Sequence, residues 1–192
     1  MPVWKALVAE VMLQRTRAEQ VVPVFERFDR RYQDPESFAA ASHEEIRELL
    51  EPLGLRWRVP LMVSLAREIG KFEGRLPRSI AELRELPGVG EYVAAATLSL
   101  HTGVRAVILD ANTVRVFSRL VGRPYDGETR RQGWIRDLAE RITPPRAHRR
   151  FNYGLLDIAM TICTPSAPRC EECPLRRWCV TAPVAGEPSR HE

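Results

Sequence analysis

The segment CTPSAPRCEECPLRRWC, residues 163–179, contains all the cysteines of this 192-residue chain, in the order C-x6-C-x2-C-x5-C: Cys163, Cys170, Cys173 and Cys179. Four thiols within 17 residues can converge on one point and indicate a metal centre. A redox CxxC pair would not need the flanking cysteines, and a disulfide framework would need an oxidising compartment. Structural zinc sites usually have two C-x2-C pairs separated by a longer segment. Only one such pair is present here, so zinc is the less favoured metal.

The length and composition of the chain are typical of a small intracellular protein. The chain is long enough for one domain, or for two small domains that share an interface. Its net charge of +4 is by itself a weak indication of nucleic-acid binding. The first residues, MPVWKALVAEVMLQ, have no long apolar core, so we expect neither a signal peptide nor a membrane span. Free thiols and a metal centre both favour a reducing compartment, and we expect a cytoplasmic protein.

Helical patterns run through the chain and predict an all-α fold. Residues 3–14 place apolar side chains at helical spacing. Ser42 with Glu45, and Ser79 with Glu82, form S-x-x-E patterns that predict the starts of two more helices. No segment alternates convincingly enough to predict a sheet. Residues 183–192 are polar and rich in Pro and Gly, and we expect a disordered tail.

A glycine turn between two helical patterns is the second informative segment. LRELPGVGEYVAAATLSL, residues 83–100, places Gly88, Val89 and Gly90 between them. Glycines let backbone N–H groups approach a ligand closely, and the start of the second helix favours an anion. Such a turn can hold a DNA phosphate without reading the base sequence. A plain hairpin of two helices is the alternative.

An aspartate that follows an apolar segment is the third feature. In AVILDANTVRVFSRL, residues 106–120, Asp110 separates the segment 106–109, which we expect in the core, from a helical pattern. Asp before a helix commonly caps it. The functional alternative places Asp110 at the mouth of a cavity, and both roles can coexist.

Together these segments resemble the iron–sulfur helix-hairpin-helix DNA glycosylases of the endonuclease III superfamily, and EVMLQRT at 10–16 and FNYGLLDIAMTIC at 151–163 add to the resemblance. The resemblance implies a bilobal helical fold: a six-helix barrel with the hairpin at 1–104, a smaller lobe at 105–182, and a DNA cleft between them. It implies a [4Fe-4S] cluster on the four cysteines and a monovalent cation at the hairpin. The family usually has another helix before EVMLQRT, and this chain begins almost inside the EVMLQRT helix.

The resemblance also implies an activity and the residues that carry it. These enzymes flip a nucleotide out of duplex DNA and break its N-glycosidic bond. Asp110 matches the carboxylate that stabilises the oxocarbenium-like transition state. Bifunctional members form a Schiff base through a lysine just after the hairpin, where this chain has Tyr92. Lys5 and Lys71 are the only lysines and lie in no motif, so we expect a monofunctional glycosylase.

Two further residues match positions that fill the gap left by the flipped base. These are Gln14 and Leu55, and wedging of this kind offsets lost stacking. The alternative for Gln14 is a solvated helix face, and the alternative for Leu55 is ordinary core packing.

The resemblance leaves two target bases open. Glu10 matches the acid that protonates adenine in adenine glycosylases, although thymine/uracil mismatch glycosylases also have Glu there. Ala111, Leu55, Gly154 and Ala159 are closer to the mismatch group, and the sequence stops before the C-terminal domain expected of adenine glycosylases. We therefore expect a monomeric enzyme that acts on double-stranded DNA with T or U opposite G, with adenine as the alternative. A remote alternative is a non-enzymatic DNA-binding module with a zinc site.

Overall fold

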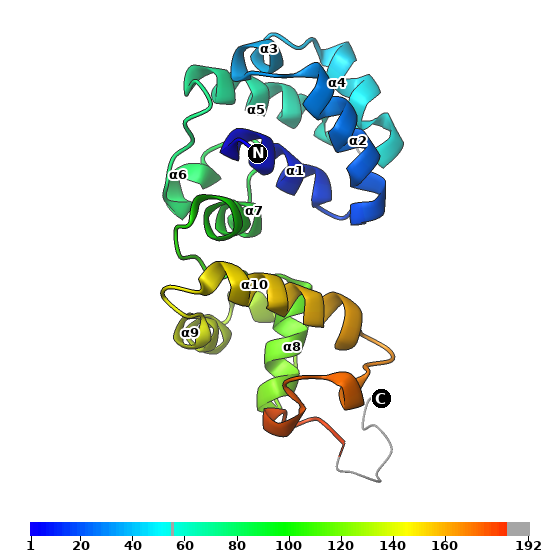
Figure 1. Cartoon of the computed structure of the whole chain (residues 1–192), viewed down its shortest axis with the longest axis vertical. Helices are drawn as coiled ribbons and strands as arrows, with labels where there is room; N and C mark the ends of the chain where they lie inside the picture. Colours follow the sequence, from blue (N-terminus) through cyan, green and yellow to red (C-terminus); the bar gives the residue numbers. More distant parts are fainter. Residues whose placement is uncertain (55, 184–192) are drawn as a thin grey trace. The chain divides into compact units, whose positions relative to one another are not determined.

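The structure is a computed structural model that describes residues 1–54 and 56–183 (Figure 1). Within these residues all regular secondary structure is helical, which confirms the all-α prediction. Leu55 and residues 184–192, which include most of the expected tail, lie outside the described residues. None of the described helices combines the length and the hydropathy needed to cross a membrane.

The chain divides into two compact units, Met1–Val104 and Arg105–Glu192. The helices of the first unit are α1 (Val3–Leu13), α2 (Ala18–Arg31), α3 (Pro35–Ala39), α4 (His43–Leu50), η1 (Glu51–Leu53), η2 (Arg56–Arg58), α5 (Val59–Lys71), α6 (Ile80–Arg84), α7 (Glu91–Ala96) and η3 (Thr97–Thr102). Those of the second are α8 (Ala111–Val121), η4 (Thr129–Arg131), α9 (Gly133–Ile142), α10 (His148–Asp157), η5 (Ile158–Ile162), η6 (Cys170–Glu172) and η7 (Arg176–Trp178).

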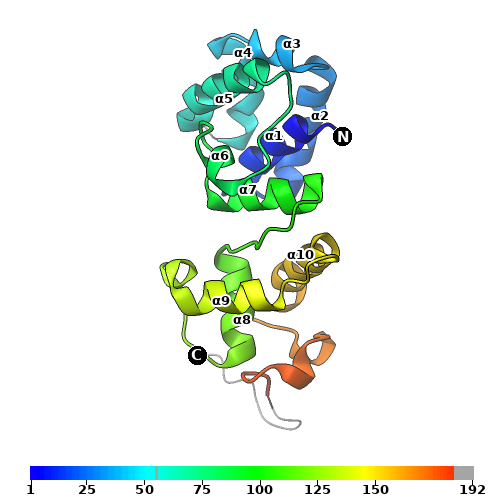
Figure 2. The same cartoon turned by 90° about the vertical axis from the view of Figure 1, so that its left-hand side faces the viewer.

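Helix α1 is central to the first unit and contacts α2, α7 and η3 (Figure 2). An aromatic cluster anchors its start, where Trp4 packs on Phe28 of α2 and on Phe38 of α3. The Phe28 and Phe38 rings meet edge to face with centroids 5.0 Å apart, a favourable geometry for aromatic pairs. The predicted helix at 3–14 is confirmed, because the apolar positions on α1 are those that the unit buries.

The two predicted helix starts differ in detail. Ser42 and Glu45 form the full reciprocal capping box at α4, with the Glu45 N–H donating to Ser42 Oγ (3.2 Å) and the Ser42 N–H donating to Glu45 Oε2 (2.8 Å). Ser79 caps α6 by accepting from the Glu82 N–H, but its hydroxyl also donates to the Glu82 carboxylate (2.6 Å). The prediction for Ser79 and Glu82 is therefore correct for the N-cap. It is wrong for the capping box, because the Glu82 carboxylate bonds the Ser79 hydroxyl and not the Ser79 backbone N–H.

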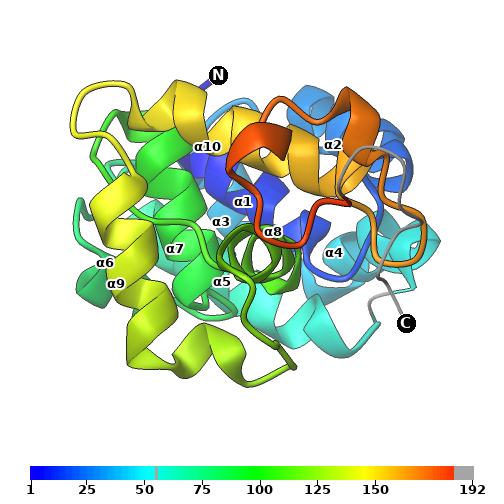
Figure 3. The same ribbon diagram turned by 90° about the horizontal axis from the view of Figure 1, so that it is seen from below.

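The second unit is built around α8, which packs against α9 and α10 (Figure 3). Phe117 is buried in its core, and the partly buried Val107 and Leu109 also pack there. The predicted entry of residues 106–109 into the core is therefore confirmed. This core supports the start of α8, where Asp110 lies, and the end of η5, where the cysteine segment begins.

Candidate active site and cysteine loop

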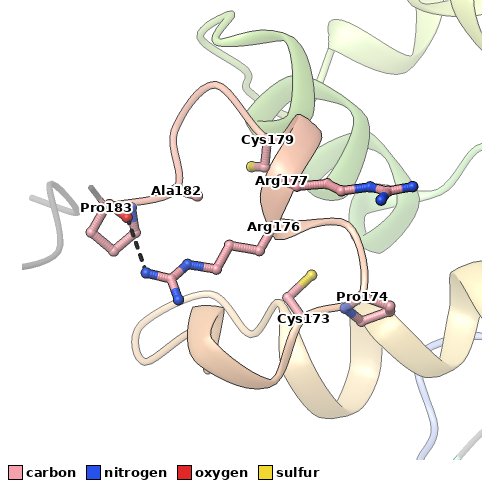
Figure 4. Close-up of a pocket in the computed structure, with 7 residues that line it drawn as sticks. All are labelled: Cys173, Pro174, Arg176, Arg177, Cys179, Ala182 and Pro183. Carbon is pink, nitrogen blue, oxygen red and sulfur yellow. Dashed lines mark hydrogen bonds between the residues drawn. The ribbon is translucent and has the colours of Figure 1, made fainter. Parts of the chain in front are cut away.

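The four cysteines line one small cavity in the second unit. Two short 3₁₀ turns, η6 and η7, each place a cysteine just after them, Cys173 and Cys179. In the adjoining pocket, Arg176 extends between these two cysteines toward the Pro183 carbonyl (Figure 4). Within the described residues, no group of three or more His, Cys, Asp or Glu side chains is arranged to hold a metal ion. The four thiols thus share one cavity.

Burial raises the pKa of two of these thiols. It raises the pKa of Cys170, and the negative charge of the other three thiolates raises it further. Burial also raises the pKa of Cys173, where backbone N–H groups partly oppose the increase. A thiolate must form before it can bind a metal, so nearby positive charge favours metal binding by Cys170 and Cys173.

Two buried arginines of α8 reach the same loop. Arg119 donates to the carbonyls of Thr164 and Pro165 (2.8 Å each) and approaches Cys163 Sγ (Nη1 to Sγ, 3.5 Å). Arg115, one helical turn earlier, donates from Nε to the Cys163 carbonyl (2.8 Å) and from Nη2 to the Ala159 carbonyl (2.7 Å). Both guanidinium groups therefore contact Cys163, one at its carbonyl and the other at its sulfur.

Asp110 is half-buried at the start of α8, where it forms a full capping box with Thr113. Its Oδ1 accepts from the backbone N–H groups of Asn112 (3.0 Å) and Thr113 (2.8 Å), and its Oδ2 accepts from Asn112 Nδ2 (2.9 Å). Asn112 Oδ1 in turn accepts from Arg115 Nη1 (3.2 Å). The predicted capping role is confirmed, and a chain of hydrogen bonds joins Asp110 to the carbonyl of Cys163 through Asn112 and Arg115.

The hairpin turn lies between α6 and α7. Gly88 adopts φ = 76°, a conformation that favours glycine, whereas Gly90 is extended and caps α7. Val89 is buried and its N–H donates to the Leu86 carbonyl (3.1 Å), so this part of the turn closes on itself. Gln14 Nε2 donates to the Gly88 carbonyl (3.0 Å). Gln14 therefore braces the turn, which contradicts the alternative of a solvated helix face.

Glu10 lies on α1 with only 7% of its side chain exposed, and its Oε1 is 3.1 Å from His101 Nε2. Both residues belong to the first unit. Tyr92 is half-buried on α7. Leu55, the other expected wedge, is outside the described residues.

Residues 8–140 match the HhH-GPD superfamily of base excision DNA repair proteins. The chain belongs to this superfamily. It is similar to a thymine-DNA glycosylase of Aeropyrum pernix, with 41% identity over 92% of this chain and 82% of the relative. A thymine/uracil-DNA glycosylase of Pyrobaculum aerophilum is 37% identical over 90% of this chain and 77% of its own length. An adenine DNA glycosylase of Buchnera aphidicola is 31% identical over 92% of this chain but only 52% of the relative.

Solved structures agree with the family. A thermostable thymine-DNA glycosylase superposes with a TM-score of 0.81 and 32% identity, covering 93% of this chain and 83% of that one. Endonuclease III in a non-covalent DNA complex gives a TM-score of 0.79 and 25% identity, over 94% and 84% of the two chains. The expected endonuclease III-like helical fold is thus confirmed. The chain is a base-excision DNA glycosylase, an enzyme that acts on N-glycosyl bonds.

Three structural residues of this glycosylase were missed in the sequence: Arg58, Arg115 and Arg119. Arg58 is only 2% exposed; it donates to the carbonyls of Val11 (2.9 Å) and Gln14, and so holds the end of α1. Burial lowers its pKa, and the nearby positive charge of Arg15 adds to the decrease. In an arginine-rich sequence nothing marks these residues, although the spacing of Arg115 and Arg119 does place both on one face of α8.

Proposed function

We propose that this protein is a monofunctional DNA glycosylase that removes thymine or uracil mispaired with guanine. The choice of thymine or uracil as the target base depends on the similarity to known glycosylases. Three relatives named thymine-DNA or thymine/uracil-DNA glycosylases are 35–41% identical, and the chain covers 77–82% of their lengths. The adenine DNA glycosylases compared are 30–33% identical, and the chain covers 32–52% of theirs.

Asp110 is the residue proposed to stabilise the reacting sugar. Three N–H groups donate to its carboxylate and fix its position at the start of α8. A fixed negative charge lowers the barrier when the sugar develops oxocarbenium character as the base leaves. Asp110 thus needs only to face C1′ of a flipped nucleotide, and no proton transfer to it is required.

The placement of the two lysines supports a monofunctional reaction. A lyase step through a Schiff base needs a side-chain amine near C1′. Lys5 is buried in α1 and paired with Asp29 (2.6 Å), and Lys71 pairs with Glu68 on α5 (2.7 Å). Tyr92 occupies the position after the hairpin where bifunctional relatives have lysine. We therefore propose that excision leaves an intact abasic site.

The cysteine cavity fits a [4Fe-4S] cluster better than a zinc ion. In such a cluster each cysteine binds a different iron, so the thiolates surround the group, whereas zinc draws four ligands to one point. All four cysteines line the cavity, and the buried guanidinium groups of Arg115 and Arg119 offset negative charge. When bound, the cluster would cross-link the 163–179 loop. We assign it to Cys163, Cys170, Cys173 and Cys179.

DNA contacts are proposed for the first unit. The turn at Gly88, Val89 and Gly90 would meet the phosphate backbone, together with the monovalent cation expected there. Gln14, braced on this turn, and Leu55 would fill the space of the flipped base. A monomer bound to double-stranded DNA, and hence to the nucleoid, accounts for these contacts.

The test is single-turnover excision on duplexes that contain T:G, U:G, A:G or A:8-oxoguanine, with and without alkali after the reaction. We expect strand breaks for T:G and U:G only after alkali. The Asp110→Asn variant, the matched control, should bind the same duplexes without excision. Excision confined to the adenine pairs would assign the enzyme to the alternative substrate. DNA binding without excision of any base would instead favour a non-enzymatic module.

A further inference from the structure

Trp57 is a large aromatic residue of η2 that remains 59% exposed in the first unit. The guanidinium carbon of Arg58 lies over its ring, 4.7 Å from the ring centroid. A planar ring has two faces, and a cation on one of them leaves the other for a second planar group. Proteins that bind unpaired nucleic acid use exposed aromatic rings of this kind to stack on bases.

Arg58 anchors this ring to the end of α1. The residue is only 2% exposed, and its guanidinium donates to the carbonyls of Val11 and Gln14. Gln14 in turn donates from Nε2 to the Gly88 carbonyl of the hairpin turn (3.0 Å). One ring contact and a series of hydrogen bonds therefore connect Trp57 to the turn that is proposed to meet the DNA backbone.

Leu61 extends the apolar surface from Trp57 toward the same turn. It follows Trp57 by four positions, where η2 runs directly into α5, and it is 38% exposed. A Cβ added at Gly88 would lie 3.6 Å from Leu61 Cβ, so Leu61 lies against the turn. Residues four apart in a helix are neighbours on one face. Trp57 and Leu61 are thus exposed apolar neighbours beside the hairpin, and adjoining exposed apolar side chains mark binding surfaces.

Positive charge flanks the Trp57 ring. Arg15, at the end of α1, is exposed and close enough to Arg58 for the two positive charges to interact. Arg56 is also exposed, and its contact with Glu51 is long (3.7 Å). Among the described residues, neither Arg15 nor Arg58 has a carboxylate partner. A polyanion that offers free ring faces complements this surface, and DNA with an opened base pair is such a polyanion.

We propose that Trp57 stacks on a base that loses its neighbour when the target nucleotide leaves the duplex. This inference rests on the proposed function and adds a stacking residue to the gap-filling roles of Gln14 and Leu55. In paired DNA each base is covered by its neighbours, so a protein ring finds a free face only where a nucleotide has left the stack. The Trp57 ring offsets the stacking lost there, and binding of the opened duplex becomes tighter than binding of intact DNA.

The test uses a duplex with a tetrahydrofuran abasic-site analogue opposite G, which contains no target base, and the same duplex fully paired. Dissociation constants and thermal unfolding are measured for the wild type, Trp57→Ala, Trp57→Phe and Trp57→Leu. Phe keeps a stacking face, whereas Leu keeps only apolar area. Phe72→Ala, which removes a 40% exposed aromatic side chain at the end of α5, is the matched control.

We expect Trp57→Ala to weaken binding of the analogue duplex by about 5- to 100-fold, the range for the loss of one base–aromatic stack. Binding of the paired duplex should change by less than about twofold, because phosphate contacts dominate it. The slope of log Kd against log salt should stay the same, since stacking neutralises no phosphate. Trp57→Phe should retain most of the affinity and Trp57→Leu should not. The Tm should stay near that of the wild type, because Arg58 keeps its carbonyl acceptors.

Equal weakening on both duplexes, a smaller salt slope in Trp57→Ala, or full affinity in Trp57→Leu would overturn the inference. So would analogue binding by Trp57→Ala as tight as that of Phe72→Ala. Failure of the proposed function is a separate outcome, because the analogue contains no target base. If the wild type excises only adenine, the proposed function is wrong, and weaker analogue binding in Trp57→Ala still supports the stacking role. If the wild type excises T and U and Trp57→Ala binds as the wild type does, only the stacking role is wrong.

Discussion

Replacing Arg115 by Met tests whether α8 holds the cysteine loop. Arg115 is 5% exposed and donates to Cys163 O, Ala159 O and Asn112 Oδ1. Hydrogen bonds to charged groups contribute about 1.5–3 kcal/mol each. The cost of burying the guanidinium disappears with it, and Met fills part of the space. We therefore expect a net loss of about 3 kcal/mol in the free energy of unfolding, which corresponds to a decrease in Tm of about 6–12 °C.

The loss of stability in Arg115→Met should also appear locally, in the segment that Arg115 contacts. Hydrogen exchange of peptides that cover residues 158–169 should become roughly 100-fold faster in Arg115→Met, because about 1.4 kcal/mol corresponds to a factor of ten. In the wild type this segment contains the bonds from Cys163 N–H to Ile158 O (2.7 Å) and from Arg169 N–H to Ile162 O (2.9 Å). Iron bound per chain should fall in the same variant.

Arg131→Met is the matched control, since Arg131 is an exposed arginine of the same unit that pairs with Glu128. Exposed pairs contribute about 0–1 kcal/mol, so its Tm should stay near that of the wild type. Equal exchange rates and equal Tm values for Arg115→Met and Arg131→Met would refute the bracing role of Arg115.

Three other predictions concern the active site and the loop. Asp110→Asn should abolish excision in the single-turnover assay but cost less than about 1 kcal/mol of stability, because Asn caps helices as well as Asp does; a Tm well below the wild type would contradict this. Gly122→Ala should destabilise more than Gly103→Ala: both residues have positive φ, but only at Gly122 does an added Cβ meet a side chain, 2.6 Å from Val180 Cγ1. Equal decreases in Tm for the two variants would show that Val180 moves away from the added Cβ at little cost. Borohydride should trap no covalent complex with abasic DNA, because Tyr92 has no amine; efficient trapping would disprove a monofunctional reaction.

Local patterns predicted the parts of the fold that depend on neighbours in sequence. Ser42 and Glu45 are three residues apart, and the bonds between them need only the first turn of a helix. The cap at Asp110 is equally local. The cysteine spacing predicted a shared site for the same reason, because the four thiols lie on one short loop and line one cavity.

Contacts between distant residues could not be predicted in this way. Gln14 and Gly88 are 74 positions apart, and Arg115 and Cys163 are 48 apart. The sequence offered a wedge or a solvated side chain for Gln14, and neither describes a bond to the hairpin carbonyl. Such contacts depend on how the helices pack, and helix packing permits several crossing geometries for the same apolar pattern.

The carboxylates of Asp110 and Glu10 are held in different ways. The Asp110 carboxylate accepts from three N–H donors on Asn112 and Thr113, and it lies at the positive end of α8, which also favours negative charge. These bonds fix the position of the carboxylate at the start of α8. Glu10 Oε1, in contrast, lies 3.1 Å from the ring nitrogen Nε2 of His101. The capping box that starts α8 therefore also fixes the carboxylate that the proposed excision needs.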